Sequence, residues 1–112
     1  MENKIKNKFL ACPITLYDKN ECNVIRIHTD KNDDTINEDI DNYILLHDGI
    51  SRSFINYEWS FNPISLSVEI AHNDKNRMIY KYKDRRVVEF NKKTLLYLNY
   101  HYDIFRKKIL GV

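Results

Sequence analysis

Residues 30–41 carry oxygen-bearing side chains at the spacing of a calcium-binding loop. Positions 1, 3, 5, 9 and 12 of such a loop are occupied by Asp30, Asn32, Asp34, Glu38 and Asp41. An EF-hand loop requires glycine at position 6 for its sharp turn and a bidentate glutamate at position 12, whereas this chain has Thr35 and an aspartate there. We therefore expect no metal site and interpret these residues as the acidic N-terminus of a helix.

Histidine and cysteine supply the other candidates for catalysis or metal binding. The four histidines are His28, His47, His72 and His101. No two of them have a ligand spacing such as His-x-x-x-His, and the two cysteines, which lack the Cys-x-x-Cys spacing, are expected to be reduced thiols. The chain also lacks a nucleophile elbow and a phosphate loop. The sequence thus predicts a protein that is not an enzyme and needs no cofactor; the alternative is a catalytic pocket assembled in space near His101 or His28.

Charge is the most informative feature of the chain, because a net value of +2 conceals two opposite regions. Seven acidic residues lie between positions 30 and 48, where Lys31 is the only lysine or arginine. From position 74 onward, eleven basic residues face four acidic ones. The pattern predicts a molecule with an acidic pole and a basic half.

The acidic pole favours binding to a basic protein, since complementary charge accelerates association and sets specificity. The chain also has eight tyrosines, a residue type enriched at interface hot spots. We expect a non-catalytic, protein-binding inhibitor of the immunity or antitoxin type, which masks the functional surface of one cognate partner such as a basic nuclease toxin. Its predicted contact residues are Asp33, Asp34, Asp39, Asp41 and Tyr43.

The basic half supports an alternative function, that of a small nucleic-acid-binding regulator. The predicted contact residues for this function are Lys81, Lys83, Arg85 and Arg86. Tyrosines alternate with them and could stack on bases. However, no helix-turn-helix, RNP or zinc-finger pattern accompanies them, and lysine at a sheet edge also serves to block aggregation. Nucleic acid is expected as a partner only under this alternative.

Length and hydropathy indicate a single cytoplasmic domain. A chain of 112 residues with 43% hydrophobic and 30% charged residues is ordinary for one globular domain. No apolar run approaches the ~20 residues that cross a bilayer, and the first residues lack the apolar core of a secretory signal. We expect one α+β domain over residues 1–112, with no membrane partner.

Apolar residues at alternate positions predict a largely antiparallel sheet of about six strands. In chain order, the predicted strands span residues 8–17, 23–28, 54–61, 65–70, 78–82 and 86–90. Residues 54–61 contain the only tryptophan and are expected to form the centre of the core with residues 65–70. The connections are short enough for hairpins, and one of them is a turn at residues 72–76.

Apolar residues spaced by three and four predict two amphipathic helices. The first spans residues 36–47, preceded by a capping-box threonine at position 35 and followed by Gly49. The second spans residues 92–109, capped by Asn91 and ended by Gly111. The order is therefore ββαββββα, and we expect an α+β fold with both helices packed on one face of the sheet.

Overall fold

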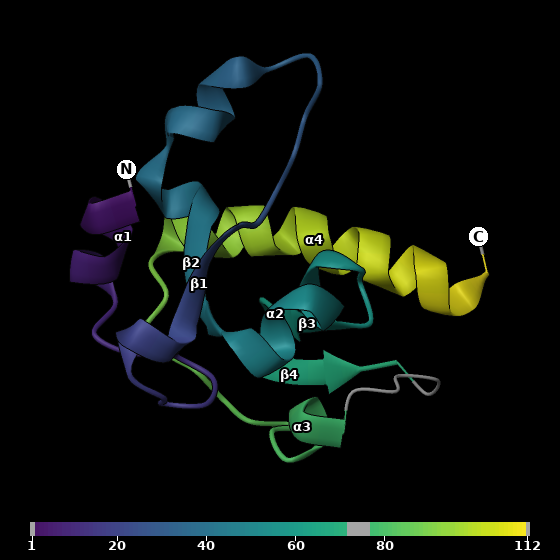
Figure 1. The fold of residues 1–112 in the computed structure, drawn as a ribbon. Coiled ribbons are helices and arrows are strands. Elements are labelled where there is room, and N and C mark those ends of the chain that lie inside the picture. Colours follow the sequence, from purple (N-terminus) through teal and green to yellow (C-terminus); the bar gives the residue numbers. More distant parts are fainter. Residues whose placement is uncertain (1, 72–76, 112) are drawn as a thin grey trace.

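The computed structural model describes residues 2–71 and 77–111, and both helices and strands occur along this part of the chain (Figure 1). The α-helices are α1 (Glu2–Lys8), α2 (Asp48–Ile55), α3 (Arg77–Tyr80) and α4 (Lys92–Leu110). Three 3-10 helices are η1 (Lys19–Glu21), η2 (Asp34–Glu38) and η3 (Ile40–Asn42). The strands are β1 (Cys22–Arg26), β2 (Tyr43–His47), β3 (Trp59–Asn62) and β4 (Ser67–Ile70). The predicted α+β class is confirmed.

The strands form two separate antiparallel pairs. β1 pairs with β2, with Val24 opposite Leu45, and β3 pairs with β4, with Phe61 opposite Val68. These are the sheets found in the described residues. The prediction of one sheet of about six strands with two helices on one face is therefore wrong.

The predicted first strand, residues 8–17, is the end of α1 followed by a tight loop. Leu16 has a φ of +66°, and its amide donates to the carbonyl of Cys12 at 2.8 Å. The chain therefore turns back where the pattern predicts an extended strand. Leu10 and Leu16 are exposed, whereas Cys12 and Ile14, on the same predicted face, are buried. The partner of β1 is consequently β2.

The predicted helix at residues 36–47 is also wrong, because this segment divides into 3-10 turns and the strand β2. Ile44, Leu45 and Leu46 are all buried. An amphipathic helix buries residues three and four apart, whereas consecutive buried side chains fit a strand covered on both faces. Both α1 and α2 pack against β2. The conformation of this segment is therefore decided by packing against helices that lie outside it.

His47 and Gly49 accordingly lie at the start of a helix rather than at the end of one. The Nδ1 atom of His47 accepts a hydrogen bond from the amide of Gly49 at 3.1 Å, which caps α2. A Cβ atom on Gly49 would collide with the sulfur of Met78. Glycine at this position therefore allows α2 and α3 to approach each other closely.

The aromatic stretch at residues 54–61 is half helix and half strand. α2 continues through Ile55, and the chain then reverses at Tyr57, which has a φ of +58°. Ile55 is exposed, contrary to the predicted alternation, whereas Trp59 and Phe61 are buried in β3 as predicted. The expected antiparallel pairing of this stretch with the following strand is confirmed by β3 and β4.

The predicted hairpin of residues 78–82 and 86–90 does not form. The first segment begins in α3, and the second is irregular. The backbone at Arg85, just before the second segment, lies beside β4, because the amide of Val68 donates a hydrogen bond to the carbonyl of Arg85 at 3.0 Å. The predicted turn at 72–76 lies outside the described residues.

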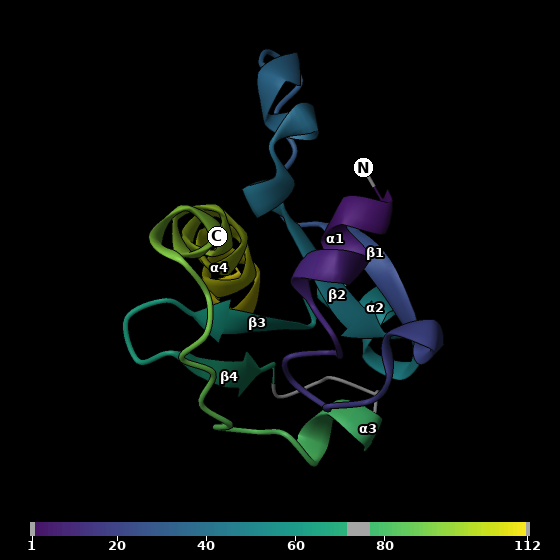
Figure 2. The same ribbon diagram turned by 90° about the vertical axis from the view of Figure 1, so that its left-hand side faces the viewer.

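α4 confirms the predicted helix at residues 92–109 and both of its ends. The side chain of Asn91 accepts a hydrogen bond from the amide of Thr94 at 2.8 Å, and Gly111 takes the left-handed conformation with a φ of +72°. Leu98 and Phe105 are buried, and the helix packs against β3 (Figure 2). α4 thus provides a long, well-capped element against which other segments are held.

Candidate functional site

Between β1 and β2 the chain leaves the body of the protein as a projecting arm, residues 28–42 (Figures 1 and 2). We call this segment the acidic arm. It contains six acidic residues and one basic residue, Lys31, so its net charge is −5. The acidic pole predicted from the sequence is therefore a projecting segment rather than the N-terminus of a helix over residues 36–47.

The base of the arm is fixed by the amide of Asn42, which is fully buried. Its Oδ1 atom accepts a hydrogen bond from the amide of His28 at 2.8 Å. Its Nδ2 group donates to the carbonyls of His28 and Ile36, at 2.9 and 3.1 Å. One side chain therefore joins the two ends of the arm to its middle. Asn42 is not predictable as an anchor from the sequence, because asparagine is common in this chain and nothing in its spacing marks it.

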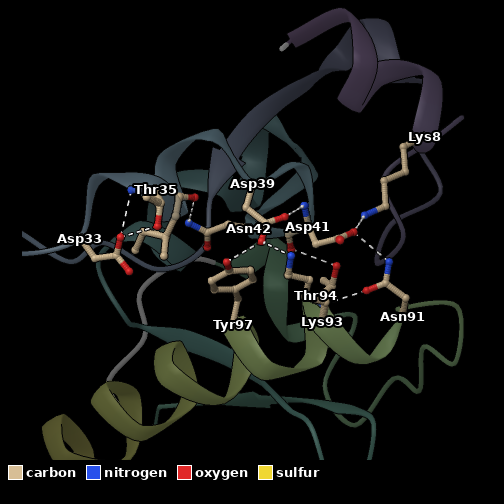
Figure 3. Close-up of polar contacts among 11 residues, drawn as sticks. Lys8, Asp33, Thr35, Asp39, Asp41, Asn42, Asn91, Lys93, Thr94 and Tyr97 are labelled. Atoms are coloured by element: carbon tan, nitrogen blue, oxygen red, sulfur yellow. Dashed lines mark hydrogen bonds and ion pairs between the residues drawn. The ribbon is translucent and has the colours of Figure 1, made fainter.

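The carboxylate of Asp39 holds the arm against α4 (Figure 3). It accepts a hydrogen bond from the hydroxyl of Tyr97 at 2.7 Å and forms an ion pair with the ammonium of Lys93 at 2.8 Å. It also accepts from the amide of Asp41 at 3.0 Å. Partial burial raises the pKa of Asp39, but the hydrogen bonds from Lys93 and Tyr97 outweigh that effect and hold the pKa below its ordinary value.

Asp41 ties the arm to α1 and to the start of α4 (Figure 3). Its carboxylate pairs with Lys8 at 2.7 Å and accepts a hydrogen bond from Asn91 at 2.9 Å. Its backbone carbonyl accepts from the hydroxyl of Thr94 at 3.0 Å. The bond from Lys8, and next that from Asn91, lower the pKa of Asp41. The side chains of Asp39 and Asp41 are only 14% and 21% exposed, so both act as anchors within the chain.

Of the other predicted contact residues, Asp33 and Asp34 lie in the arm and Tyr43 is the first residue of β2. Asp33 caps η2, because its carboxylate accepts a hydrogen bond from the amide of Thr35 at 3.0 Å. The hydroxyl of Tyr43 donates to a carbonyl of the arm. Asp34 is exposed, as is Glu38, and neither side chain has a partner among the described residues. These two carboxylates are therefore available to an external cation.

An open hollow of about 1140 Å³ lies beside the arm, between it and the two helices that anchor it. Its lining residues are Lys4, Asp33, Thr35, Ile36, Glu38, Asp39, Ile40, Asp41, Lys93 and Tyr97. Carboxylates and isoleucine side chains thus line one continuous surface. Such a surface can accept a long basic side chain, whose aliphatic stem packs on apolar atoms while its charged head meets a carboxylate.

His101 forms a hydrogen-bonded pair with Ser60 that resembles a catalytic dyad in its spacing. The Nδ1 atom of His101 lies 2.7 Å from the Ser60 hydroxyl, and its Nε2 atom lies 2.7 Å from the carbonyl of Phe54. Because a carbonyl can only accept, Nε2 donates and Nδ1 accepts from Ser60. Burial lowers the pKa of His101 to about 4, against the opposing effect of the Phe54 carbonyl. Only 2% of His101 is exposed and none of Ser60, so the pair contributes to the core.

The remaining groups that could carry chemistry are not arranged as sites in the described residues. No cluster of three or more histidine, cysteine or acidic side chains there is able to hold a metal ion. Burial, followed by the effect of Cys12, raises the pKa of Cys22 to about 11, which disfavours its thiolate. His28 stacks on Tyr100, with ring centroids 4.3 Å apart.

No helix in residues 2–71 or 77–111 is long and apolar enough to span a membrane.

The four basic residues of the alternative site follow α3 on an irregular segment. Lys81, Lys83 and Arg86 are exposed, and the Arg85 guanidinium lies 5.8 Å from the centre of the Tyr82 ring. Because the segment is not a hairpin, the predicted alternation of basic and aromatic side chains along a strand is absent from it.

Comparison with protein-family models gives no match to this sequence, and comparison with curated proteins gives none either.

Proposed function

We propose that this protein is a non-catalytic inhibitor of the immunity or antitoxin type, which binds one cognate basic protein through the acidic arm. The observation that carries this proposal is that four of the arm's six carboxylates fall into two groups. Asp39 and Asp41 bind side chains of α1 and α4, whereas Asp34 and Glu38 are exposed and have no partner among the described residues. The first group positions the arm, and the second is presented to a partner.

A positioned arm supports tight binding because little order has to be gained on association. Asn42, Asp39 and Asp41 attach the arm at its two ends, its middle and its side, so the exposed carboxylates are held at defined places. Pre-organisation of this kind lowers the entropic cost of forming an interface. The net charge of −5 in turn raises the rate of encounter with a cationic surface.

An acidic projecting arm is suited to masking the nucleic-acid-binding surface of a nuclease. Such a surface is basic because it binds phosphates. The arm and the adjoining hollow present carboxylates, which a phosphate-binding surface can contact in place of phosphate groups. The inhibitor then acts by occupying the site and needs no reaction of its own.

The test begins with the tagged protein and a lysate of its native host, treated or not treated with nuclease. One stoichiometric protein that is retained after nuclease treatment is the expected result, and its association rate is then measured. The double variant Asp34→Lys, Glu38→Lys is expected to slow association at least about tenfold at low salt. The matched control reverses two exposed carboxylates outside the arm, Glu21→Lys and Glu89→Lys. Equal rates for the two double variants would overturn the proposal.

A second candidate function, nucleic-acid binding through Lys81, Lys83, Arg85 and Arg86, is favoured by their closeness in sequence and by the cation–π contact between Arg85 and Tyr82. It predicts that the protein alone binds duplex DNA or single-stranded RNA oligonucleotides with an affinity that falls steeply as salt rises. Fluorescence anisotropy with the wild type and the Lys81→Ala, Lys83→Ala variant tests it. Binding that is insensitive to both salt and these substitutions would contradict it.

A further inference from the structure

β1 is the outer strand of its pair, and one of its edges has no neighbouring strand among the described residues. Figure 2 shows β1 at the margin of the molecule, with β2 on its inner side. Just after β1, the amide of Ile27 donates to the carbonyl of Asn42 in the direction of β2, at 2.8 Å. Because hydrogen-bonded and non-hydrogen-bonded positions alternate along an antiparallel pair, the backbone groups of Val24 and Arg26 face away from β2. These groups have no hydrogen-bond partner in the part of the chain that the structure describes.

The outer edges of the other strands are closed. At the centre of β2, the outward-facing groups belong to Leu45, which lies opposite Val24 and is fully buried. On β3 they belong to Trp59 and Phe61, which are buried where α4 packs. On β4 the outward amide of Val68 is bonded to the segment that follows α3. Within the described residues, the open edge is therefore that of β1, whose outward-facing residues reach solvent.

This edge lacks most of the features that keep a free strand from pairing. Proline, lysine and bulges serve that purpose in many sheets. β1 contains no proline or lysine, and its five residues pair with β2 without a bulge. Its charged residue, Arg26, donates a hydrogen bond to the side chain of Asn37 in the acidic arm at 3.0 Å. The edge is therefore suited to receive another strand, which supplies donors and acceptors at the matching spacing.

We propose that the outer edge of β1 binds an extended segment of the cognate protein by strand addition, and that lysine or arginine residues precede this segment. The identity of the partner rests on the proposed function, whereas the open edge does not depend on it. In complexes of this kind the backbone bonds supply affinity and the neighbouring side chains supply specificity. The added strand turns the β1–β2 pair into a three-stranded sheet, which is more stable than two strands alone.

Charge determines which end of the segment is basic. The acidic arm begins at residue 28, close to the C-terminal end of β1, whereas η1, at the other end, carries Lys19 and Glu21, whose charges cancel. An antiparallel partner strand, which pairs slightly more stably than a parallel one, has its N-terminal end beside the arm. Basic residues that precede the segment therefore lie on the side of the exposed carboxylates of Asp34 and Glu38.

Two synthetic peptides of identical composition test the proposal with the full chain. In the first, a run of lysines precedes a strand of alternating valine and threonine, and in the second the lysines follow that strand. At low salt the lysine-first peptide is expected to bind at least about tenfold more tightly in fluorescence anisotropy. Val24→Pro should weaken this binding at least about tenfold, because proline removes an outward-facing amide and leaves the bonds to β2 intact. Val24→Ala, which keeps the amide, is the matched control.

Amide hydrogen exchange provides a second measurement that needs no substitution. In the free protein, the amides of Val24 and Arg26 should exchange faster than those of Ile25 and Ile27, which face β2. The lysine-first peptide should slow exchange at Val24 and Arg26 at least about tenfold. Failure of both peptides to bind, or binding that leaves these two amides unchanged, would overturn the proposal.

The result can be separated from that of the proposed function. If the peptide slows exchange at Val24 and Arg26 but the lysate yields no stoichiometric partner, strand addition is supported and the inhibitor function is not. The reverse result is a partner whose association is slowed by Asp34→Lys, Glu38→Lys but whose complex leaves the two amides exchanging as in the free protein. That result supports the inhibitor function and overturns strand addition.

Discussion

Two polar clusters hold α4 in place, and they differ in charge and in burial. The first lies at the N-terminal half of the helix, where Lys93 and Tyr97 bind the carboxylate of Asp39 near the surface. The second lies further along, where the neutral ring of His101 is hydrogen-bonded on both sides in the core. The first attaches the acidic arm, and the second attaches β3 and the end of α2.

This difference indicates which cluster stabilises the fold and which one positions the binding surface. Water and salt can replace much of a contact between exposed charges, so such a contact contributes little stability. A buried polar group whose partner is removed has no water to replace it, so the loss is large. We therefore expect changes at His101 to affect global stability and changes around Asp39 to affect mainly the arm.

The largest effect is expected from His101→Ala. This change removes two hydrogen bonds and the stacked contact with Phe54, whose ring centroid lies 3.7 Å away, and it leaves the Ser60 hydroxyl unpaired. The cavity and the unsatisfied groups together should lower the free energy of unfolding by about 4 kcal/mol. Urea denaturation followed by circular dichroism measures it.

Asn99→Ala is the matched control for this change, because Asn99 lies on the exposed side of the same helix and has similar size. Its effect should stay within about 0.5 kcal/mol. A loss below about 1 kcal/mol for His101→Ala would show that the buried cluster is not the stronger of the two.

A smaller effect is expected from pH. The pKa of His101 is about 4 in the folded protein and 6.5 at its ordinary value. The folded protein therefore binds fewer protons than the unfolded chain between these values, and stability falls as pH is lowered through the window. The shift corresponds to about 3 kcal/mol at most. Unfolding free energies measured between pH 7 and pH 4 should show this slope.

The His101→Gln variant should lose that slope, because glutamine does not titrate. The charged cluster titrates in a different window, since Asp39 and Asp41 have pKa values lowered from 3.8. Their contribution is present above that value and is lost only at more acidic pH. An equal slope in wild type and His101→Gln above pH 4 would assign the pH dependence to other groups.

The sequence predicted α4 well because every signal that defines it is local. The cap at Asn91, the apolar spacing and the terminal Gly111 all lie within the helix or next to it, and the structure confirms them. The segment 36–47 carries similar local signals, yet β2 forms there because β1, α1 and α2 cover it. β1 and α1 lie well before β2 in the sequence, and α2, which follows β2 directly, was not predicted as a helix.

The candidate site was predictable in its charge but not in its contacts. Counting charges located the acidic pole, and the structure places it on a projecting arm. Whether a given aspartate is exposed or paired depends on where Lys8, Asn91 and Lys93 lie in space. These residues are far from the arm in the sequence, so the sequence alone does not indicate the contacts. The same limit applies to the Ser60–His101 pair, whose members are separated by 41 positions.

The smallest effect is expected at the charged cluster. Tyr97→Phe removes the hydroxyl that donates to Asp39 and retains the ring, so it should lower the free energy of unfolding by about 1 kcal/mol. Lys93→Met should have a smaller effect, which disappears at high salt because Lys93 is largely exposed. Both variants should nevertheless speed amide exchange in residues 28–42 more than in β3, since they loosen the arm without opening the core. A loss of stability equal to that of His101→Ala, or exchange that rises equally in the arm and in β3, would show that the two clusters form one cooperative unit.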